Sequence, residues 1–302
     1  MKVGLVLQTD EDVDVGRRPA PFGVLRDLAL QVEAAGFDSI WLYDHLLYRF
    51  EGRPSQGTWE CWTILSALAA ITERVELGTL VSCTGYRNPG LIAKMASTVD
   101  EISGGRLILG LGAGWHQPEY EAFGYPFDHR VDRFEEALRI IVPLLREGHV
   151  DFSGTYYRAP NCDLLPRGPR PQGPPLLIGG LGPRILRLTA RFADSWNIGF
   201  HTPPEAIIPR MEAACAEMGR DPSTLEITLL RIVAYPELVP LPSDFPPYVT
   251  GTAEAIAAEL GRYEQLGVGH VMLECTPTTP DTLQRLSAAL ERYRQGAGGV
   301  QG

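Results

Sequence analysis

Residues 38–45 read DSIWLYDH, an apolar stretch that ends in an acid and an imidazole side by side. Ser39 to Tyr43 suit a strand that is buried on both faces, because such strands are mostly apolar and rich in β-branched and aromatic residues. Asp44 and His45 depart from this pattern. They either cap the turn after the strand or stand at the mouth of a functional site, and the rest of the chain decides between these interpretations.

Strand patterns alternate with helical patterns along the whole chain. The expected strands are residues 3–8, 38–45, 75–82, 106–114, 176–180, 194–200, 225–235 and 270–275. Eight parallel strands joined through helices close into a barrel, so we predict an α/β fold, a parallel (β/α)8 TIM barrel over residues 1–295. A doubly wound open sheet is the alternative. We expect loop insertions at 46–60 and 148–175, the second with a hairpin, and a flexible tail at 296–302.

Composition excludes several classes of protein. The net charge of -10 and the pI of about 5.1 provide no positive field for nucleic acid or an anionic membrane. No stretch of about 18 apolar residues could span a bilayer. The five cysteines are odd in number and contain no C-x-x-C, which favours neither disulfides nor a thiolate zinc site. We therefore expect a cytoplasmic protein without nucleic-acid or membrane partners.

The barrel prediction brings the carboxyl ends of all eight strands to one rim, where barrel enzymes keep their chemistry. The residues at these ends are Gln8, Thr9, Asp44, His45, Ser82, Cys83, Gly114, Trp115, His116, Gly179, Gly180, Asn197, Arg231, Glu274 and Cys275. This position favours a functional interpretation of Asp44 and His45 over a cap beside a half-buried histidine.

The run GGLG at Gly179–Gly182 precedes a helical pattern and could present backbone amides to a phosphate, or it could form only a tight turn. GLGAGW at 110–115 is no dinucleotide fingerprint, because Trp115 stands where glycine is required. His116 and Glu119 have a spacing that could ligate a metal, but no further ligand motif accompanies them, so we predict no metal. Four isolated histidines receive no role: His129, His149, His201 and His270.

Three blocks of sequence resemble the bacterial luciferase-like monooxygenase superfamily: GFDSIWLYDH, residues 75–124 with VELGTLVS, YRNP and DEISGGRLILGLGAGWHQPEYEAFG, and IGGLGPRILRLTARFADSWN. The Asp-His pair after the second strand is similar to the branch that uses the deazaflavin coenzyme F420. The resemblance implies an oxidoreductase that transfers hydride between F420 and a small organic substrate, and it implies a homodimer. A luciferase-like monooxygenase that uses flavin mononucleotide (FMN) is the alternative.

The resemblance also implies roles for single residues. His45 becomes a candidate acid/base, and Asp44 becomes the ring-contacting residue that orients it. A non-proline cis peptide is implied at Leu80–Val81, behind the cofactor ring, with Cys83 nearby. The remaining cofactor contacts that the resemblance implies are Gly114, Trp115, Gly179, Gly180, Leu181 and Gly182.

One departure from the family pattern concerns the substrate. Sugar-phosphate dehydrogenases of the F420 branch carry a glutamate where this chain has Trp115, which argues against their substrate. Trp115, His116 and Tyr120 instead resemble FMN monooxygenases and are expected to contact the substrate. Two other hypotheses are a flavin-binding barrel without turnover and a cofactor-free isomerase or aldolase. The latter would need a rim lysine or paired carboxylates, whereas Lys94 lies within a helical pattern.

Overall fold

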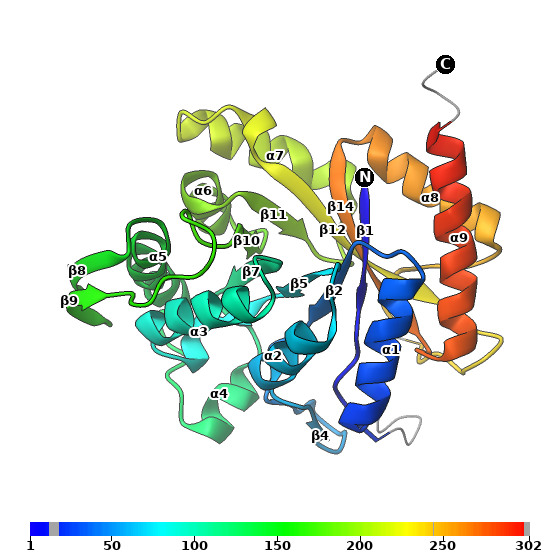
Figure 1. The fold of residues 1–302 in the computed structure, drawn as a ribbon, viewed down its shortest axis with the longest axis horizontal. Helices are drawn as coiled ribbons and strands as arrows, with labels where there is room; N and C mark the ends of the chain where they lie inside the picture. Colours follow the sequence, from blue (N-terminus) through cyan, green and yellow to red (C-terminus); the bar gives the residue numbers. More distant parts are fainter. Residues whose placement is uncertain (12–17, 244, 299–302) are drawn as a thin grey trace.

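The computed structural model describes residues 1–11, 18–243 and 245–298 (Figure 1). Its barrel strands are β1 (Lys2–Val6), β2 (Ser39–Leu42), β5 (Glu76–Thr79), β7 (Leu107–Gly112), β10 (Leu176–Gly179), β11 (Ser195–Ile198), β12 (Glu226–Ala234) and β14 (Val268–Thr276). Each strand pairs in parallel with its neighbours, and β10 pairs with β7, which closes the sheet. The predicted eight-stranded parallel barrel is confirmed.

Helices lie outside the strands, as Figure 1 shows. They are α1 (Phe22–Ala34), α2 (Cys61–Ile71), α3 (Pro89–Ile102), α4 (Gln117–Phe123), α5 (Arg130–Glu147), α6 (Pro183–Phe192), α7 (Pro204–Glu217), α8 (Ala253–Gln265) and α9 (Pro280–Gly298). The short α4 was not expected. Pro143 lies within α5, which continues as one helix to Glu147. The predicted tail begins inside α9, and its residues 299–302 lie outside the described residues.

The two predicted insertions have structure of their own. The loop after β2 contains the antiparallel pair β3 (Leu47–Tyr48) and β4 (Gln56–Gly57). The expected hairpin at 148–175 is present as β8 (His149–Ser153) and β9 (Arg158–Asp163). Two further short strands extend the barrel sheet, β6 (Ser82–Cys83) beside β7 and β13 (Tyr248–Val249) beside β12.

Side chains fill the interior of the barrel below the rim. The buried residues of this cluster are Val6, Trp41, Leu80, Ile108, Leu177, Leu230 and Met272. Trp41 is the bulkiest of them, and Gly78 makes room for its ring, because an added Cβ there would come within 2.2 Å. At the amino-terminal end, Ser39 Oγ accepts the indole N–H of Trp41 at 2.7 Å and lies 2.7 Å from His270 Nε2. Buried side chains therefore fill the amino-terminal end of the barrel, and an accessible reactive site is expected at the opposite, carboxyl-terminal rim.

The buried His270 should make the free energy of unfolding depend on pH in the acid range. Burial lowers its pKa to about 3, below the value of about 6.5 for an unfolded histidine. This contribution is therefore complete above pH 6.5 and is lost as the pH falls toward 3. Between pH 6.5 and 5 the free energy of unfolding should fall by about 2 kcal/mol more in the wild type than in His270→Gln. Urea unfolding at both pH values measures this difference, and parallel curves would contradict it.

Candidate active site

Asp44 lies just after β2, and its carboxylate is buried. Oδ2 accepts hydrogen bonds from Ser82 Oγ at 3.0 Å and from the Cys83 backbone N–H at 2.9 Å. Arg87 donates to both oxygens, at 2.6 and 2.9 Å, and also to Glu60 at 2.5 Å. Burial alone would lower the pKa of Arg87, but the two carboxylates raise it. Asp44 is therefore held in a buried ion pair that joins the ends of β2 and β6.

His45, the next residue, contacts a different carboxylate. Its Nδ1 lies 2.8 Å from Oε1 of Glu119 on α4. The Glu119 side chain is fully buried, and its oxygens also accept from the Tyr86 hydroxyl and from the Leu46 backbone N–H, the latter at 2.9 Å. The resemblance implied that Asp44 orients His45. The structure corrects this expectation, because the carboxylate that holds the imidazole is Glu119.

The contact with Glu119 defines which nitrogen of His45 is available. Burial raises the pKa of Glu119, but hydrogen bonds from His45, Tyr86 and Leu46 outweigh burial and keep the pKa below its usual value. An ionised Glu119 accepts the Nδ1 proton, which leaves Nε2 of a neutral imidazole with its lone pair. The His45 side chain is 16% exposed, and no described residue forms a hydrogen bond with Nε2. Nε2 can therefore take or give a proton at the rim.

The three predicted substrate contacts face different ways. Trp115 is 57% exposed, and its ring meets that of His45 edge to face with 5.7 Å between centroids. His116 is buried, and its Nε2 accepts the Arg49 backbone N–H at 2.9 Å; burial lowers its pKa. Tyr120 is buried, and its hydroxyl donates to a backbone carbonyl at 3.0 Å. His116 and Tyr120 thus anchor α4 instead of facing the open rim, whereas Trp115 is exposed, and its contact with a substrate stays a prediction.

The peptide between Leu80 and Val81 is cis, as the resemblance implied. It lies between β5 and β6. Leu80 is buried inside the barrel, and Val81 packs against that interior cluster. An added Cβ at Gly112 or Gly179 would come within 2.6 or 3.2 Å of the Val81 methyl groups. Val81 therefore lies at the mouth of the barrel between glycines of β7 and β10.

Cys83 and Gly114 meet behind this mouth. The Cys83 Sγ atom lies 2.8 Å from the Tyr120 hydroxyl, and burial raises the pKa of the thiol to about 12. Gly114 has a φ of 72°, and an added Cβ would come within 2.0 Å of that hydroxyl. Only glycine fits here, and Cys83 remains a buried, protonated thiol that packs under α4.

The glycine run of the predicted phosphate site joins β10 to α6. Gly180 has a φ of 136°, which favours glycine, and its Cβ would come within 2.9 Å of Ile185. An added Cβ at Gly182 would meet nothing within 4 Å, and no side chain of the described residues caps the helix at this residue. Amides in the first turn of α6 are therefore available to an anion. Leu181 is half-buried between these glycines.

A second polar group at the rim joins Gln8, Tyr43 and Glu274. The Tyr43 hydroxyl donates to Glu274 Oε2 at 2.5 Å, and the Gln8 amide donates to Oε1 at 3.0 Å. Burial and the neighbouring Glu274 raise the pKa of Tyr43, so its hydroxyl keeps its proton. The sequence placed Gln8 and Glu274 on the rim but provided no reason to connect them.

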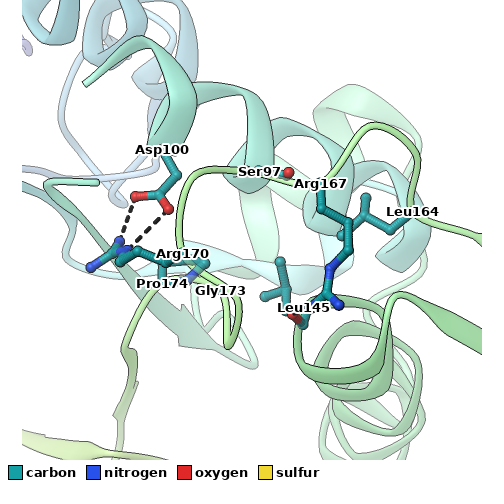
Figure 2. Close-up of a pocket in the computed structure, with 9 residues that line it drawn as sticks. Ser97, Asp100, Leu145, Leu164, Arg167, Arg170, Gly173 and Pro174 are labelled. Atoms are coloured by element: carbon teal, nitrogen blue, oxygen red, sulfur yellow. Dashed lines mark hydrogen bonds and ion pairs between the residues drawn. The ribbon is translucent and has the colours of Figure 1, made fainter. Parts of the chain in front are cut away.

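Two cavities lie apart from these residues. Figure 2 shows the first, of about 10 Å³, where Arg170 forms two hydrogen bonds with Asp100 near the amino-terminal end of β7. It has room for about one water molecule. The second, of about 450 Å³, lies beside Tyr235 and the start of α8, and its Arg285 is paired with Glu237. Neither cavity includes a predicted site residue.

Metal-ligand clusters, membrane-spanning helices and disulfides are absent from the described part of the chain. Within residues 1–11, 18–243 and 245–298, no three His, Cys, Asp or Glu side chains gather as metal ligands. No helix in these ranges combines the length and apolar composition that a membrane span requires. The five cysteines form no disulfides.

The closed barrel, the cis peptide and the rim histidine occur together with a match to a known family. The sequence profile described as luciferase-like monooxygenase matches residues 1–237. The chain belongs to the luciferase-like monooxygenase family. This finding confirms the predicted superfamily, and the relatives described below are oxidoreductases by name, which is the enzyme class that the sequence predicts.

Relatives of this luciferase-like protein include a monooxygenase and an F420-dependent dehydrogenase. Pyrimidine monooxygenase RutA of Rhizobium rhizogenes is 32% identical over 69% of this chain and 60% of its own length. The F420-dependent glucose-6-phosphate dehydrogenase of Kineococcus radiotolerans is 32% identical over 68% of this chain and 62% of its own length. The chain thus spans about 60% of the length of these relatives.

A solved structure extends the likeness of the luciferase-like fold to nearly the whole chain. An F420-dependent secondary alcohol dehydrogenase, in complex with an F420-acetone adduct, has a TM-score of 0.81 and 21% identity, and covers 97% of this chain and 99% of its own. At this identity the likeness supports the fold alone.

Proposed function

We propose that the protein is an oxidoreductase that transfers hydride between coenzyme F420 and a small organic substrate. One observation carries the proposal: His45, at the rim of the barrel, is fixed through Nδ1 by the buried Glu119, and its Nε2 has no hydrogen-bond partner among the described residues. A hydride transfer to or from a carbonyl or alcohol needs a partner that moves the accompanying proton. A histidine oriented by a carboxylate has the chemistry for that task.

The residues present fit a flavin-type cofactor. The uncapped first turn of α6 and the open space at Gly182 suit a phosphate group, which the backbone can hold without a cationic field. Val81 and the bare backbone of Gly112 and Gly179 provide a close, apolar surface at the mouth of the barrel. When bound there, the deazaflavin would supply the hydride chemistry.

The side chains of this protein would orient the acid/base and transfer the proton. Nε2 of His45 takes the proton in one direction and returns it in the other, while Glu119 fixes the ring and stabilises its charged form. Asp44 supports this arrangement from a distance, because its ion pair with Arg87 fixes the strand end that carries His45. We therefore assign Asp44 to positioning, in place of direct contact with the cofactor.

An FMN-dependent monooxygenase is the second candidate. The similarity to pyrimidine monooxygenase RutA favours it, as does Trp115 in the place of the glutamate of the sugar-phosphate dehydrogenases. A barrel that binds flavin without turnover would share the phosphate site. The open Nε2 of His45 favours an active enzyme over this third candidate.

Cofactor titration tests the proposal. Oxidised F420 and FMN are each added to the purified protein, and their fluorescence is recorded to saturation. We expect F420 to be quenched at a stoichiometry of one per chain and FMN to bind more weakly. Binding of FMN alone would replace the first candidate by the second, and binding of neither would remove both.

Gly182→Asp should weaken cofactor binding without loss of stability. Aspartate is a good N-cap for α6, and a Cβ at this position meets nothing within 4 Å. Its carboxylate would occupy the amides and repel a phosphate, so the dissociation constant of the cofactor should rise about tenfold. Gly182→Asn is the matched control, because it caps the helix without the charge. Wild-type affinity in both variants would contradict a phosphate site here.

Glu119→Gln tests the orientation of His45. The amide keeps the shape of the side chain but loses the charge that selects the Nδ1–H tautomer, so turnover should fall about tenfold or more while cofactor affinity stays the same. Steady-state turnover and the titration above measure the two effects. Unchanged turnover would show that His45 needs no carboxylate partner.

We further propose a single-domain, cytoplasmic homodimer. Leu91 and Ile102 on α3 are exposed apolar side chains that a second copy of the chain could cover. Light scattering should then give a mass of twice the 33.2 kDa of one chain. A mass of one chain would contradict the dimer.

A further inference from the structure

Four aromatic rings contact one another beside His45, and two of them, Tyr48 and Trp115, contact its ring. This rim aromatic cluster consists of Tyr48, Phe50, Trp115 and His116. Tyr48 lies 4.4 Å from the His45 ring between centroids, and Phe50 is stacked on Tyr48 with an angle of 11° between the planes. His116 closes the circuit at 5.2 Å from Phe50 and 4.9 Å from Trp115. The loop after β2 and the segment before α4 thus form one aromatic surface.

Two large apolar side chains of the cluster are exposed to solvent. Trp115 is 57% exposed and Phe50 is 40% exposed, whereas Tyr48 is half-buried and His116 is buried and supports them from below. Large exposed rings next to a polar reactive group are typical of surfaces that a ligand covers. The His45 ring adjoins this surface, because it is in edge-to-face contact with the Trp115 ring.

The rim aromatic cluster carries no formal charge. Burial lowers the pKa of His116, so its ring is neutral, and burial together with Asp10 and Glu274 raises the pKa of Tyr48. Arg49, in the same loop, is exposed, and its Nε–H donates to the neutral Ser55 hydroxyl, so its positive charge lies beside the rings and not among them. A phosphorylated or carboxylated ligand would find no cation among these rings, whereas a flat, uncharged ligand could stack on the indole and the phenyl group.

We propose that the substrate is a planar, uncharged aromatic or heteroaromatic compound that stacks on Trp115 and Phe50 beside His45. The inference rests on the proposed function, since it names the substrate class of the same site. It assigns Trp115 and Phe50 to substrate selection and leaves proton transfer to His45.

Binding of simple probes tests the substrate class without turnover. Indole, cyclohexanol and glucose 6-phosphate are titrated separately into the cofactor-loaded and the cofactor-free protein, with saturation-transfer NMR as the readout. The variants are Trp115→Ala, Trp115→Phe and Phe123→Ala. Phe123 is the matched control, because its ring is 50% exposed on the neighbouring α4 and takes no part in the cluster.

The expected result is saturable binding of indole, with cyclohexanol weaker and no saturation by glucose 6-phosphate. Trp115→Ala should raise the dissociation constant of indole about three- to tenfold, Trp115→Phe should restore most of the affinity, and Phe123→Ala should change it by less than about twofold. Equal indole binding in the wild type and Trp115→Ala would overturn the proposal, as would tighter binding of either other probe. A change from dimer to monomer in Trp115→Ala would also overturn it, by making Trp115 an interface residue.

The same samples separate failure of this inference from failure of the proposed function. F420 and FMN are titrated into each variant alongside the probes. Loss of cofactor binding with Trp115-dependent binding of indole would remove the proposed function and support the aromatic surface. Cofactor binding with indole unaffected by Trp115→Ala would retain the proposed function and overturn the substrate class.

Discussion

Replacing His45 by alanine should lower turnover by about 10²- to 10⁴-fold, the usual contribution of a positioned acid/base. The affinity for the cofactor should change little, because the proposed phosphate site at Gly182 and the proposed apolar contact at Val81 do not involve the imidazole. Turnover under saturating substrate and the fluorescence titration measure the two quantities on one preparation. This split separates a role in proton transfer from a role in binding.

The matched control for this prediction is His149→Ala. His149 lies on the β8–β9 hairpin, is exposed and pairs with Asp163, so its loss should leave turnover and affinity unchanged. Turnover of His45→Ala equal to that of the control would remove the acid/base role. The proton would then have to come from another group or from water.

Replacing Arg87 by methionine should lower the free energy of unfolding by about 3–5 kcal/mol, the effect of removing one partner of a buried ion pair. The side chain of Asp44 is fully buried, and that of Arg87 is only 11% exposed. Without the guanidinium, the Asp44 carboxylate keeps only the hydrogen bonds from Ser82 and Cys83. Urea unfolding followed by circular dichroism measures the change.

An exposed ion pair serves as the control for Arg87→Met. Arg26 and Asp27 are both about half exposed, so Arg26→Met should cost less than about 1 kcal/mol. The double variant Asp44→Asn with Arg87→Met should recover part of the loss, because no uncompensated charge remains. Similar costs for both single methionine variants would contradict a buried, charged Asp44.

The barrel could be predicted from the sequence because each of its strands is buried on both faces and therefore reads as a continuous apolar run. Ile40, Trp41 and Leu42 illustrate this in β2, where all three are fully buried. The short α4 was missed because its seven residues bury only Glu119 and Tyr120 and show no helical period of apolar residues. Its termination at Gly124, with a φ of 75°, was the available signal.

The site could be predicted only as far as the strand ends. Asp44 and His45 were recognisable as polar residues after a buried strand, but their partners lie 43 and 74 positions away, at Arg87 and Glu119. Sequence separation contains no information on such contacts. The pattern of His116 and Glu119 at i and i+3 was noticed as a metal spacing, and it instead marks the turn into α4.

Residues 115–119 combine an exposed indole with the carboxylate that holds His45, and they belong to one connection between β7 and α5. Insertions or deletions in this connection would change the proposed substrate surface and, at the same time, separate Glu119 from His45. Point substitutions at Trp115 or Phe50 would change the surface alone. Directed evolution of a new substrate range should therefore vary these two side chains at constant loop length, and libraries of exchanged loops should yield mostly inactive variants.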